Sequence, residues 1–260
     1  MNHSPRTTSA RIKRPVAAFL HRSGLLGAWN RAVLRNCAVI FTYHQVLQDH
    51  EVRSEMQPGM YVTVDTLELH LRYLSEAFHI VSLDEIRDWG AGNRTFGRTP
   101  CAITFDDGWE DNYRNAFRVL VAHNVPATIF LVTEQIDTPG MMTWRQALEM
   151  EEAGISFGSH TATHPQLPAL GEEQARWELE SSLRTLQHRL KRPSDWFCYP
   201  KGLHCPATRR LAQEYYAGAV TASGGVVSRG DDVYLLNRIA LHNDVSYTVP
   251  LLTSRIARIF

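Results

Sequence analysis

The chain has 260 residues, with 27 basic and 27 acidic side chains and a formal net charge of zero. This length fits one barrel domain or two small domains, and a chain without net charge lacks the basic signature of a nucleic-acid-binding protein. The charge is unevenly placed, because residues 1–48 hold seven of the basic side chains and none of the acidic ones. Nothing in the composition predicts an oligomeric state.

The four cysteines do not form the pattern of a disulfide-stapled secreted domain, because none belongs to a C-x-x-C pair. Cys37 and Cys101 lie in apolar runs and are predicted to be buried thiols. Cys198 and Cys205 flank a Tyr-Pro-Lys-Gly turn, where a disulfide or a metal-binding role stays open.

Membrane-spanning and cleaved secretory segments are not expected. No apolar run approaches the roughly 18–20 residues that span a bilayer. Residues 11–20 imitate the start of a signal peptide, but His21 and Arg22 interrupt the apolar part and no convincing cleavage site follows. We therefore expect a location in the cytoplasm or peripherally at the membrane.

Residues 1–36 are predicted to form a basic amphipathic N-terminal segment. Residues 15–35 favour one or two helices, broken near Gly24. Their apolar stripes are expected at Val16, Phe19 and Leu20, and at Trp29 and Val33. Two roles stay open, namely a helix that closes the flank or bottom of the domain, and attachment to an anionic membrane surface.

From residue 37 onward, strand-like runs alternate with helical stripes. Strands are predicted at 37–43, 79–81, 101–105, 127–132, 155–158, 196–199, 218–221 and 238–241. Helices are predicted after Asp65 and Ser82, around 117–121, and at 144–153, 172–190, 206–216 and 249–256. This alternation is repeated some seven times without a clear linker. It predicts a single α/β domain over residues 37–260, either a barrel or a doubly wound sheet.

The run from Cys101 to Phe105 ends abruptly in Asp106, Asp107 and Gly108. Such a run predicts a buried strand that delivers charge to the carboxyl end of a sheet. Neighbouring residues of a strand point to opposite faces, so the two carboxylates can serve different roles only if the chain turns there, which Gly108 permits. A solvated Asp-Gly turn is the alternative.

Two histidines four residues apart, His160 and His164, follow the predicted strand at 155–158. In a helical turn this spacing places both imidazoles on one face, where they can share a cation. Two histidines and one aspartate would make a three-ligand site with open positions, which is the pattern of a catalytic metal.

A third stretch is Trp196-Phe-Cys-Tyr-Pro-Lys-Gly202. With Thr-Phe-Asp-Asp-Gly and His-Thr-x-x-His before it, the chain resembles the polysaccharide deacetylases, also known as the NodB-homology domain or family-four carbohydrate esterases. The resemblance covers roughly residues 37–245. It implies a distorted or incomplete (β/α) barrel of about seven parallel strands, similar to a TIM barrel, with the site at the carboxyl ends of the strands.

The resemblance also implies roles for the first two motifs. Asp106 would be the catalytic base, and Asp107, His160 and His164 would hold one divalent metal ion. Zinc is expected, with cobalt, nickel or iron as alternatives. A structural metal site, with Asp106 outside the ligand set, stays open.

The turn of the third motif would supply the oxyanion donor through a backbone N–H, with Tyr199 and Lys201 as substrate-binding residues. An ordinary Pro-Gly turn is the alternative. The chain would then be a hydrolase that removes N-acetyl groups from an amino-sugar polysaccharide or a glycan precursor. Hydrolysis of another amide or ester, and non-catalytic glycan binding, stay open.

The sequence departs from the family pattern in three places. Many members have an arginine at the position of Cys198, where it steadies the base, and Arg238 is our candidate for that role here. The family's Asp-Trp motif has no clear match, which leaves the substrate open. The general acid is normally a late histidine after a leucine, which corresponds to His242 after Leu241, with Asp244 placed to orient the ring and raise its pKa.

Overall fold

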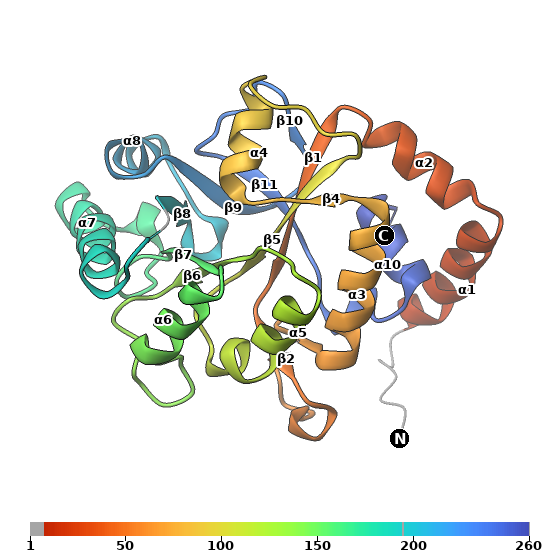
Figure 1. Ribbon diagram of the computed structural model, residues 1–260, viewed down its shortest axis with the longest axis horizontal. Coiled ribbons are helices and arrows are strands. Elements are labelled where there is room, and N and C mark those ends of the chain that lie inside the picture. Colours follow the sequence, from red (N-terminus) through yellow and green to blue (C-terminus); the bar gives the residue numbers. More distant parts are fainter. Residues whose placement is uncertain (1–7, 194, 260) are drawn as a thin grey trace.

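A computed structural model describes residues 8–193 and 195–259 of the chain. Its centre is a sheet of parallel strands that closes on itself, with helices packed around the outside (Figure 1). The ring runs in the order β1, β11, β9, β8, β7, β6 and β5, and it closes because β5 also pairs with β1. The predicted (β/α) barrel of about seven parallel strands is therefore confirmed.

The ring strands are short. They are β1 (Cys37–Tyr43), β5 (Pro100–Phe105), β6 (Thr128–Leu131), β7 (Ser156–Ser159), β8 (Trp196–Cys198), β9 (Gly218–Gly224) and β11 (Leu236–Ala240). Two further strands, β4 (His79–Ile80) and β10 (Val227–Ser228), pair only with the first residues of β5 and β1. The strand predicted at 79–81 therefore lies at the base of the barrel, outside the ring. Beyond β1, β2 (Gln45–Leu47) and β3 (Tyr61–Thr63) form a separate parallel pair.

Helices follow most of the strands and cover the outside of the ring. They are α3 (Val64–Ala77), α4 (Leu83–Gly90), α5 (Phe117–Ala122), α6 (Trp144–Glu152), α7 (Glu172–Arg189), α8 (Pro206–Tyr215), α9 (Asn243–Ser246) and α10 (Val249–Ile256). The predicted capping box at the start of α4 is confirmed, because the Ser82 hydroxyl accepts from the Glu85 N–H and the Glu85 carboxylate accepts from the Ser82 N–H.

Alternation along β1 separates two buried layers. Val39 and Phe41 pack in the cluster that extends under the outer helices. Ala38 and Ile40 pack in a cluster that continues across the ring to Phe130 of β6. The interior of the barrel is therefore filled with apolar side chains, and a site can form only above this layer, at the strand ends.

The N-terminal segment forms α1 (Thr8–Arg22) and α2 (Leu25–Val33), which are separated at Gly24 with a φ of 74°. Both helices contact α10 on one flank of the barrel. Within residues 14–33, the buried side chains are Ala17, Leu26 and Asn30, and the Asn30 amide donates to the Thr253 carbonyl at 3.1 Å. The break is where we expected it.

The helices do not pack through the stripes that the sequence suggested. Val16, Phe19, Trp29 and Val33 are exposed, whereas Leu20 is half-buried. Most of the predicted apolar stripes therefore point away from the barrel. No helix within residues 8–193 and 195–259 combines the length and apolarity that crossing a bilayer requires.

Candidate active site

Asp106 and Asp107 lie at the carboxyl end of β5, where the chain leaves the sheet. The Asp106 N–H donates to the Tyr43 carbonyl at 3.0 Å, and its side chain is buried inside the ring. Asp107 has a φ of 75° and Gly108 a φ of 82°, so the backbone turns and separates the two carboxylates. A Cβ at Gly108 would lie 2.7 Å from Leu131 Cδ2, so this position requires glycine for packing as well as for the turn.

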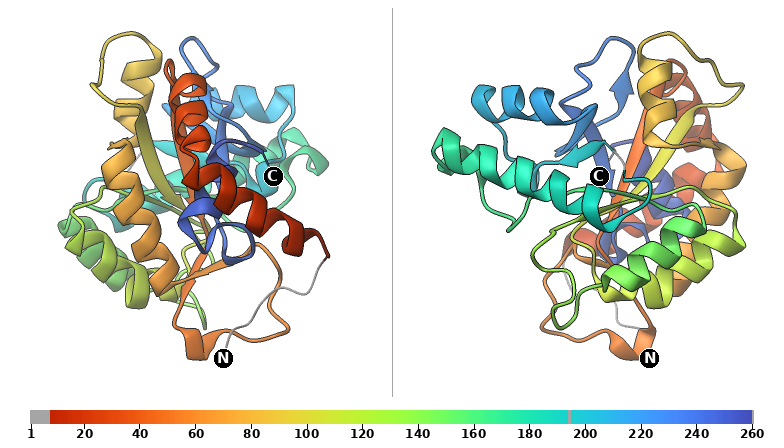
Figure 2. Two further views of the ribbon diagram at one scale, coloured as in Figure 1. Left: turned by 90° about the vertical axis from the view of Figure 1, so that its right-hand side faces the viewer. Right: turned by 60° about the vertical axis from the view of Figure 1, so that its left-hand side comes forward.

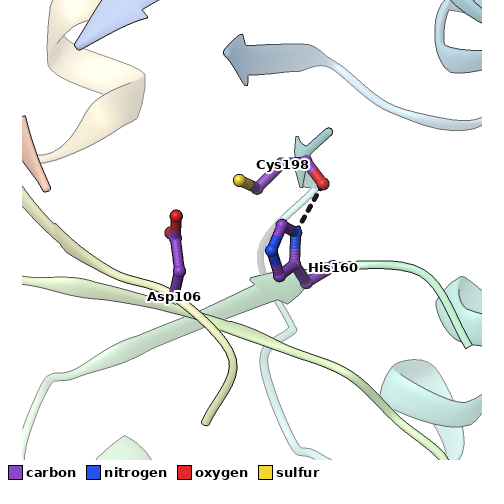
Figure 3. Close-up of side chains that lie close together, drawn as sticks. All are labelled: Asp106, His160 and Cys198. Atoms are coloured by element: carbon purple, nitrogen blue, oxygen red, sulfur yellow. Dashed lines mark hydrogen bonds between the residues drawn. The ribbon is translucent and has the colours of Figure 1, made fainter. Parts of the chain in front are cut away.

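Asp107 lies next to both predicted histidines. Its Oδ1 is 3.6 Å from His160 Nε2 and 3.7 Å from His164 Nε2. His160 Nδ1 donates to the Cys198 carbonyl at 2.7 Å (Figure 3), which leaves Nε2 as the nitrogen with the free lone pair. Ligand atoms around a tetrahedral zinc ion lie about 3.3 Å apart when each bond is about 2.0–2.1 Å. These three side chains therefore fit one divalent ion with little movement.

The histidines lie on a loop rather than on the helical turn that we expected, so that prediction is wrong. Thr161 and His164 adopt left-handed backbone, with φ of 69° and 66°, and no helical turn forms between them. The Glu178 carboxylate of α7 holds the loop, because it accepts from the Ala162 and Thr163 N–H groups and from the Thr163 hydroxyl. The two imidazoles converge through this loop geometry.

Sequence reasoning missed Glu178, which is 1% exposed. The spacing of Glu178 gave a hint of its burial, because it places Glu178 on the same helical face as Ala175 and Ser182. In the structure this face is buried, together with Leu179. A carboxylate on an otherwise buried face must find hydrogen-bond donors. This pattern predicts that Glu178 organises a neighbouring loop.

Arg238 of β11 reaches across the barrel to Asp106. Nη1 and Nη2 donate to the two carboxylate oxygens, each at 2.7 Å, and both side chains are buried. Nε donates to the Thr221 carbonyl, and Nη1 also donates to the Thr42 and Thr104 hydroxyls. Burial would raise the pKa of Asp106, but the charge and hydrogen bonds of Arg238 hold that pKa well below its usual range, so the carboxylate stays ionised.

Cys198 lies where the resemblance led us to expect an arginine, and its Sγ accepts from Arg238 Nη2 at 3.1 Å. Asp106, His160 and Cys198 form a second group close enough to hold an ion (Figure 3). However, Arg238 occupies both oxygens of Asp106, and burial raises the pKa of the Cys198 thiol, which stays protonated. Of the two groups, Asp107, His160 and His164 therefore fit a metal ion better. All four cysteines are free, so no disulfide forms.

In the turn after β8, a backbone N–H rather than the Tyr199 side chain is free to form a new contact. The Tyr199 side chain is fully buried against Phe197, and its N–H donates to the Val220 carbonyl at 3.2 Å, which removes Tyr199 from the expected substrate-binding residues. The exposed Lys201 has a φ of 56°, and its N–H has no acceptor among the residues that the structure describes. A Cβ at Gly202 would collide with the backbone of the neighbouring β9, so glycine permits this close approach.

His242 follows β11, and its Nδ1 lies 3.1 Å from Asp244 Oδ2, which also accepts from the Gly59 N–H. We expected Asp244 to raise the pKa of this histidine. Instead, burial outweighs the carboxylate and lowers the pKa of His242 below its usual value, so the ring is neutral at neutral pH. On the neighbouring β1, His44 Nε2 lies 3.9 Å from Asp106 Oδ2.

A family model described as polysaccharide deacetylase matches residues 93–219 of the chain. The match includes the Asp106 and His160 motifs and the turn at Lys201, whereas Arg238 and His242 lie beyond it. The residue that steadies Asp106 therefore comes from outside the matched segment.

The Bacillus subtilis protein YxkH is 33% identical over 145 residues, which are 55% of this chain and 52% of its own length. The poly-beta-1,6-N-acetyl-D-glucosamine N-deacetylase of Staphylococcus epidermidis is 29% identical over 168 residues, which are 56% of each chain. The chain thus spans about half the length of these curated relatives. The solved structure of the Streptococcus pyogenes deacetylase PplD in complex with acetate matches with a TM-score of 0.74 and 25% identity, over 84% of this chain and 97% of that chain. In its motifs, its barrel and these matches, the chain is similar to the polysaccharide deacetylases.

Proposed function

We propose that the chain is a metal-dependent hydrolase that removes N-acetyl groups from an amino-sugar polysaccharide or a glycan precursor. The observation that carries the proposal is the group of Asp107, His160 and His164, whose donor atoms lie within 4.8 Å of one another beside the ionised Asp106. Two relatives named for N-deacetylation of poly-beta-1,6-N-acetyl-D-glucosamine support an N-acetylated glycan as the substrate class.

Zinc is the ion that we propose, because two imidazoles and one carboxylate are donors that suit it, with cobalt, nickel and iron as alternatives. When bound, such an ion polarises the amide carbonyl and makes a water acidic enough to attack near neutral pH. The protein contributes the orientation of the ligands. The Cys198 carbonyl fixes the His160 ring, and the Thr161 hydroxyl accepts from the His164 N–H at 2.9 Å.

Asp106 is the proton acceptor for the attacking water. Arg238 donates a hydrogen bond to each of its oxygens, which keeps the carboxylate ionised and fixes its direction. The same contact makes Asp106 a weaker base than a free carboxylate, because the pKa is lowered. Arg238 therefore acts as a positioning residue, and its effect on the rate combines better placement of the base with reduced basicity.

Two further groups complete the proposed chemistry. The N–H of Lys201 is our candidate donor to the oxyanion that develops on the amide oxygen, because it has no acceptor within the described part of the chain. His242 in its protonated form gives a proton to the departing amine, and Asp106 holds the proton taken from water, so the proton count balances. Because the pKa of His242 is lowered, the fraction of enzyme with a protonated acid falls at a lower pH than for an ordinary histidine.

Acetate release tests this function. The protein, loaded with one equivalent of zinc, is incubated with β-1,6- and β-1,4-linked N-acetylglucosamine oligomers, the monomer and an O-acetylated sugar, with Asp106→Asn as the control. We expect acetate from at least one N-acetylated oligomer, loss of release with a chelator, and recovery with zinc. Release from the O-acetylated sugar alone would favour an esterase, and no release from any compound by the loaded protein would contradict the proposal.

A further inference from the structure

Exposed large apolar side chains are concentrated on the two N-terminal helices. Nine such side chains occur in the part of the chain that the structure describes, and five belong to α1 and α2, namely Val16, Phe19, Leu25, Trp29 and Val33. The most exposed of the nine is Phe19, at 68%. The other four are separated from one another along the chain, at positions 121, 177, 203 and 259. Exposed apolar side chains that gather on two contacting helices, rather than lying singly, indicate an interaction surface.

The exposed side chains form ordered stripes rather than a random scatter. Leu25, Trp29 and Val33 occur at intervals of four residues, so they share one face of α2. Val16 and Phe19 are three residues apart and share a face of α1. The left view of Figure 2 looks onto α1 and α2, which lie in front of the barrel. We refer to these five residues as the α1–α2 face.

The α1–α2 face is not needed to hold the helices in place. Ala17 and Leu26 are buried below it, and Asn30 is hydrogen-bonded to the carbonyl of Thr253 in α10. Arg14 lies over the ring of Tyr247, 5.2 Å from its centre. Both helices therefore pack on the barrel through other side chains, and the α1–α2 face is left exposed.

The charged residues of the segment that forms α1 and α2 are all basic. Residues 8–35 contain six arginines and lysines, and the first acidic residue of the chain is Asp49. Arg22, Arg31 and Arg35 have no carboxylate within ion-pair distance among the residues that the structure describes, whereas many arginines elsewhere do. These cations are therefore available to an external anion.

A cavity of about 710 Å³ extends this cationic surface along one side of α2. Its lining includes Arg31, Arg35, Arg98 and Arg229, and Glu76 is the one acidic side chain in it. The rim beside the apolar stripe can thus hold several phosphate groups. A protein partner with an acidic rim would also suit these charges, but a bilayer with anionic lipids supplies an apolar interior and a dense phosphate layer together.

We propose that the α1–α2 face binds the surface of a bilayer that contains anionic lipids. Phe19, Leu25 and Trp29 enter the boundary between headgroups and acyl chains, and Arg31 and Arg35 contact lipid phosphates. The helices lie on the right flank in Figure 1, whereas β2, which follows the carboxyl end of β1, lies at the lower side. Binding therefore leaves the strand ends open, and the proposal does not depend on the reaction that occurs there.

Vesicle sedimentation tests the proposal with the full chain. The vesicles contain phosphatidylcholine with or without one quarter phosphatidylglycerol, at low and high salt. We expect binding to the anionic vesicles and at least tenfold weaker binding to phosphatidylcholine alone. The double change Phe19→Ser with Trp29→Ser should weaken binding about tenfold or more, and Arg31→Gln with Arg35→Gln should weaken it about fivefold per residue at low salt.

Matched variants elsewhere on the surface provide the controls. Trp177→Ser removes an exposed tryptophan of α7, and Arg118→Gln removes an exposed arginine of α5. Both should bind vesicles as the unchanged protein does, and unfolding midpoints of all variants should agree within a few degrees. No binding of the intact chain to anionic vesicles at low salt would overturn the proposal. A dimer in solution that the Phe19 and Trp29 changes dissociate, without vesicle binding, would overturn it in favour of self-association.

Discussion

The change Arg238→Gln removes the cation that faces the Asp106 carboxylate. Arg238 is 2% exposed and Asp106 is 4% exposed, and two hydrogen bonds of 2.7 Å join them. Glutamine can still donate one hydrogen bond, but it leaves the Asp106 charge buried without a counter-ion. Breaking a buried ion pair from one side costs about 3–5 kcal/mol, so we expect the variant to lose about 3 kcal/mol of unfolding free energy.

Urea unfolding of metal-free protein at pH 7 measures this loss without a contribution from ligand binding. Asp106→Asn and the double variant complete a double-mutant cycle, in which we expect a coupling of about 2 kcal/mol or more, because the double variant no longer buries a charge. Arg118→Gln, on the surface of α5, serves as the control and should change the free energy by less than about 0.5 kcal/mol.

The pH dependence of the unfolding free energy tests the same ion pair, because the account predicts the direction in which it changes. In the native protein the lowered pKa of Asp106 provides stability that is complete near neutral pH and is lost as the pH falls through the folded pKa. Without Arg238, burial raises that pKa, so the variant recovers stability relative to the native protein as the pH falls. Two results would refute this account of the pair. One is a loss of unfolding free energy below about 1 kcal/mol with no coupling in the cycle. The other is a difference in unfolding free energy between the native protein and Arg238→Gln that grows as the pH falls.

Three further predictions concern individual side chains. Asp106→Asn should keep the metal but lower turnover by about 10²–10⁴-fold, as measured by metal analysis and acetate release, whereas loss of metal in this variant and not in Asp107→Asn would reverse the two roles. His242→Ala should slow amide hydrolysis far more than hydrolysis of an ester with a good leaving group, and equal losses would indicate a positioning role instead. Burial lowers the pKa of His70 to about 4, so stability should fall as the pH drops from about 6.5 toward that value. His70→Gln should reduce this loss of unfolding free energy by up to about 3 kcal/mol. An unchanged pH dependence of the free energy, measured by urea unfolding at each pH, would count against this prediction.

The sequence alone predicted the parts of the site that depend on local pattern. Asp106 and Asp107 follow a buried run that had to be a strand, and Gly108 predicted the turn that separates them. The alternation of strands and helices predicted the class of the fold. The barrel rather than a doubly wound sheet came from the family resemblance, because periodicity does not specify how a sheet closes.

Long-range features lay beyond sequence pattern. Arg238 is 132 residues from Asp106 along the chain, and only the family's missing arginine at Cys198 suggested the pairing. The sign of the pKa change at His242 was wrong, because a neighbouring carboxylate is visible in the sequence and burial is not. For the same reason, the stripe at Trp29 predicted the amphipathic helix but not which of its faces is buried.

The most direct test of the central claim is a zinc titration of the metal-free protein, with bound zinc and acetate release measured on the same samples. We predict that release rises linearly with bound zinc and stops rising at one equivalent. His164→Ala should remain folded, bind no stoichiometric zinc and release no acetate. Full release by the metal-free protein, or normal zinc binding and release by His164→Ala, would contradict the assignment of the reaction to Asp107, His160 and His164.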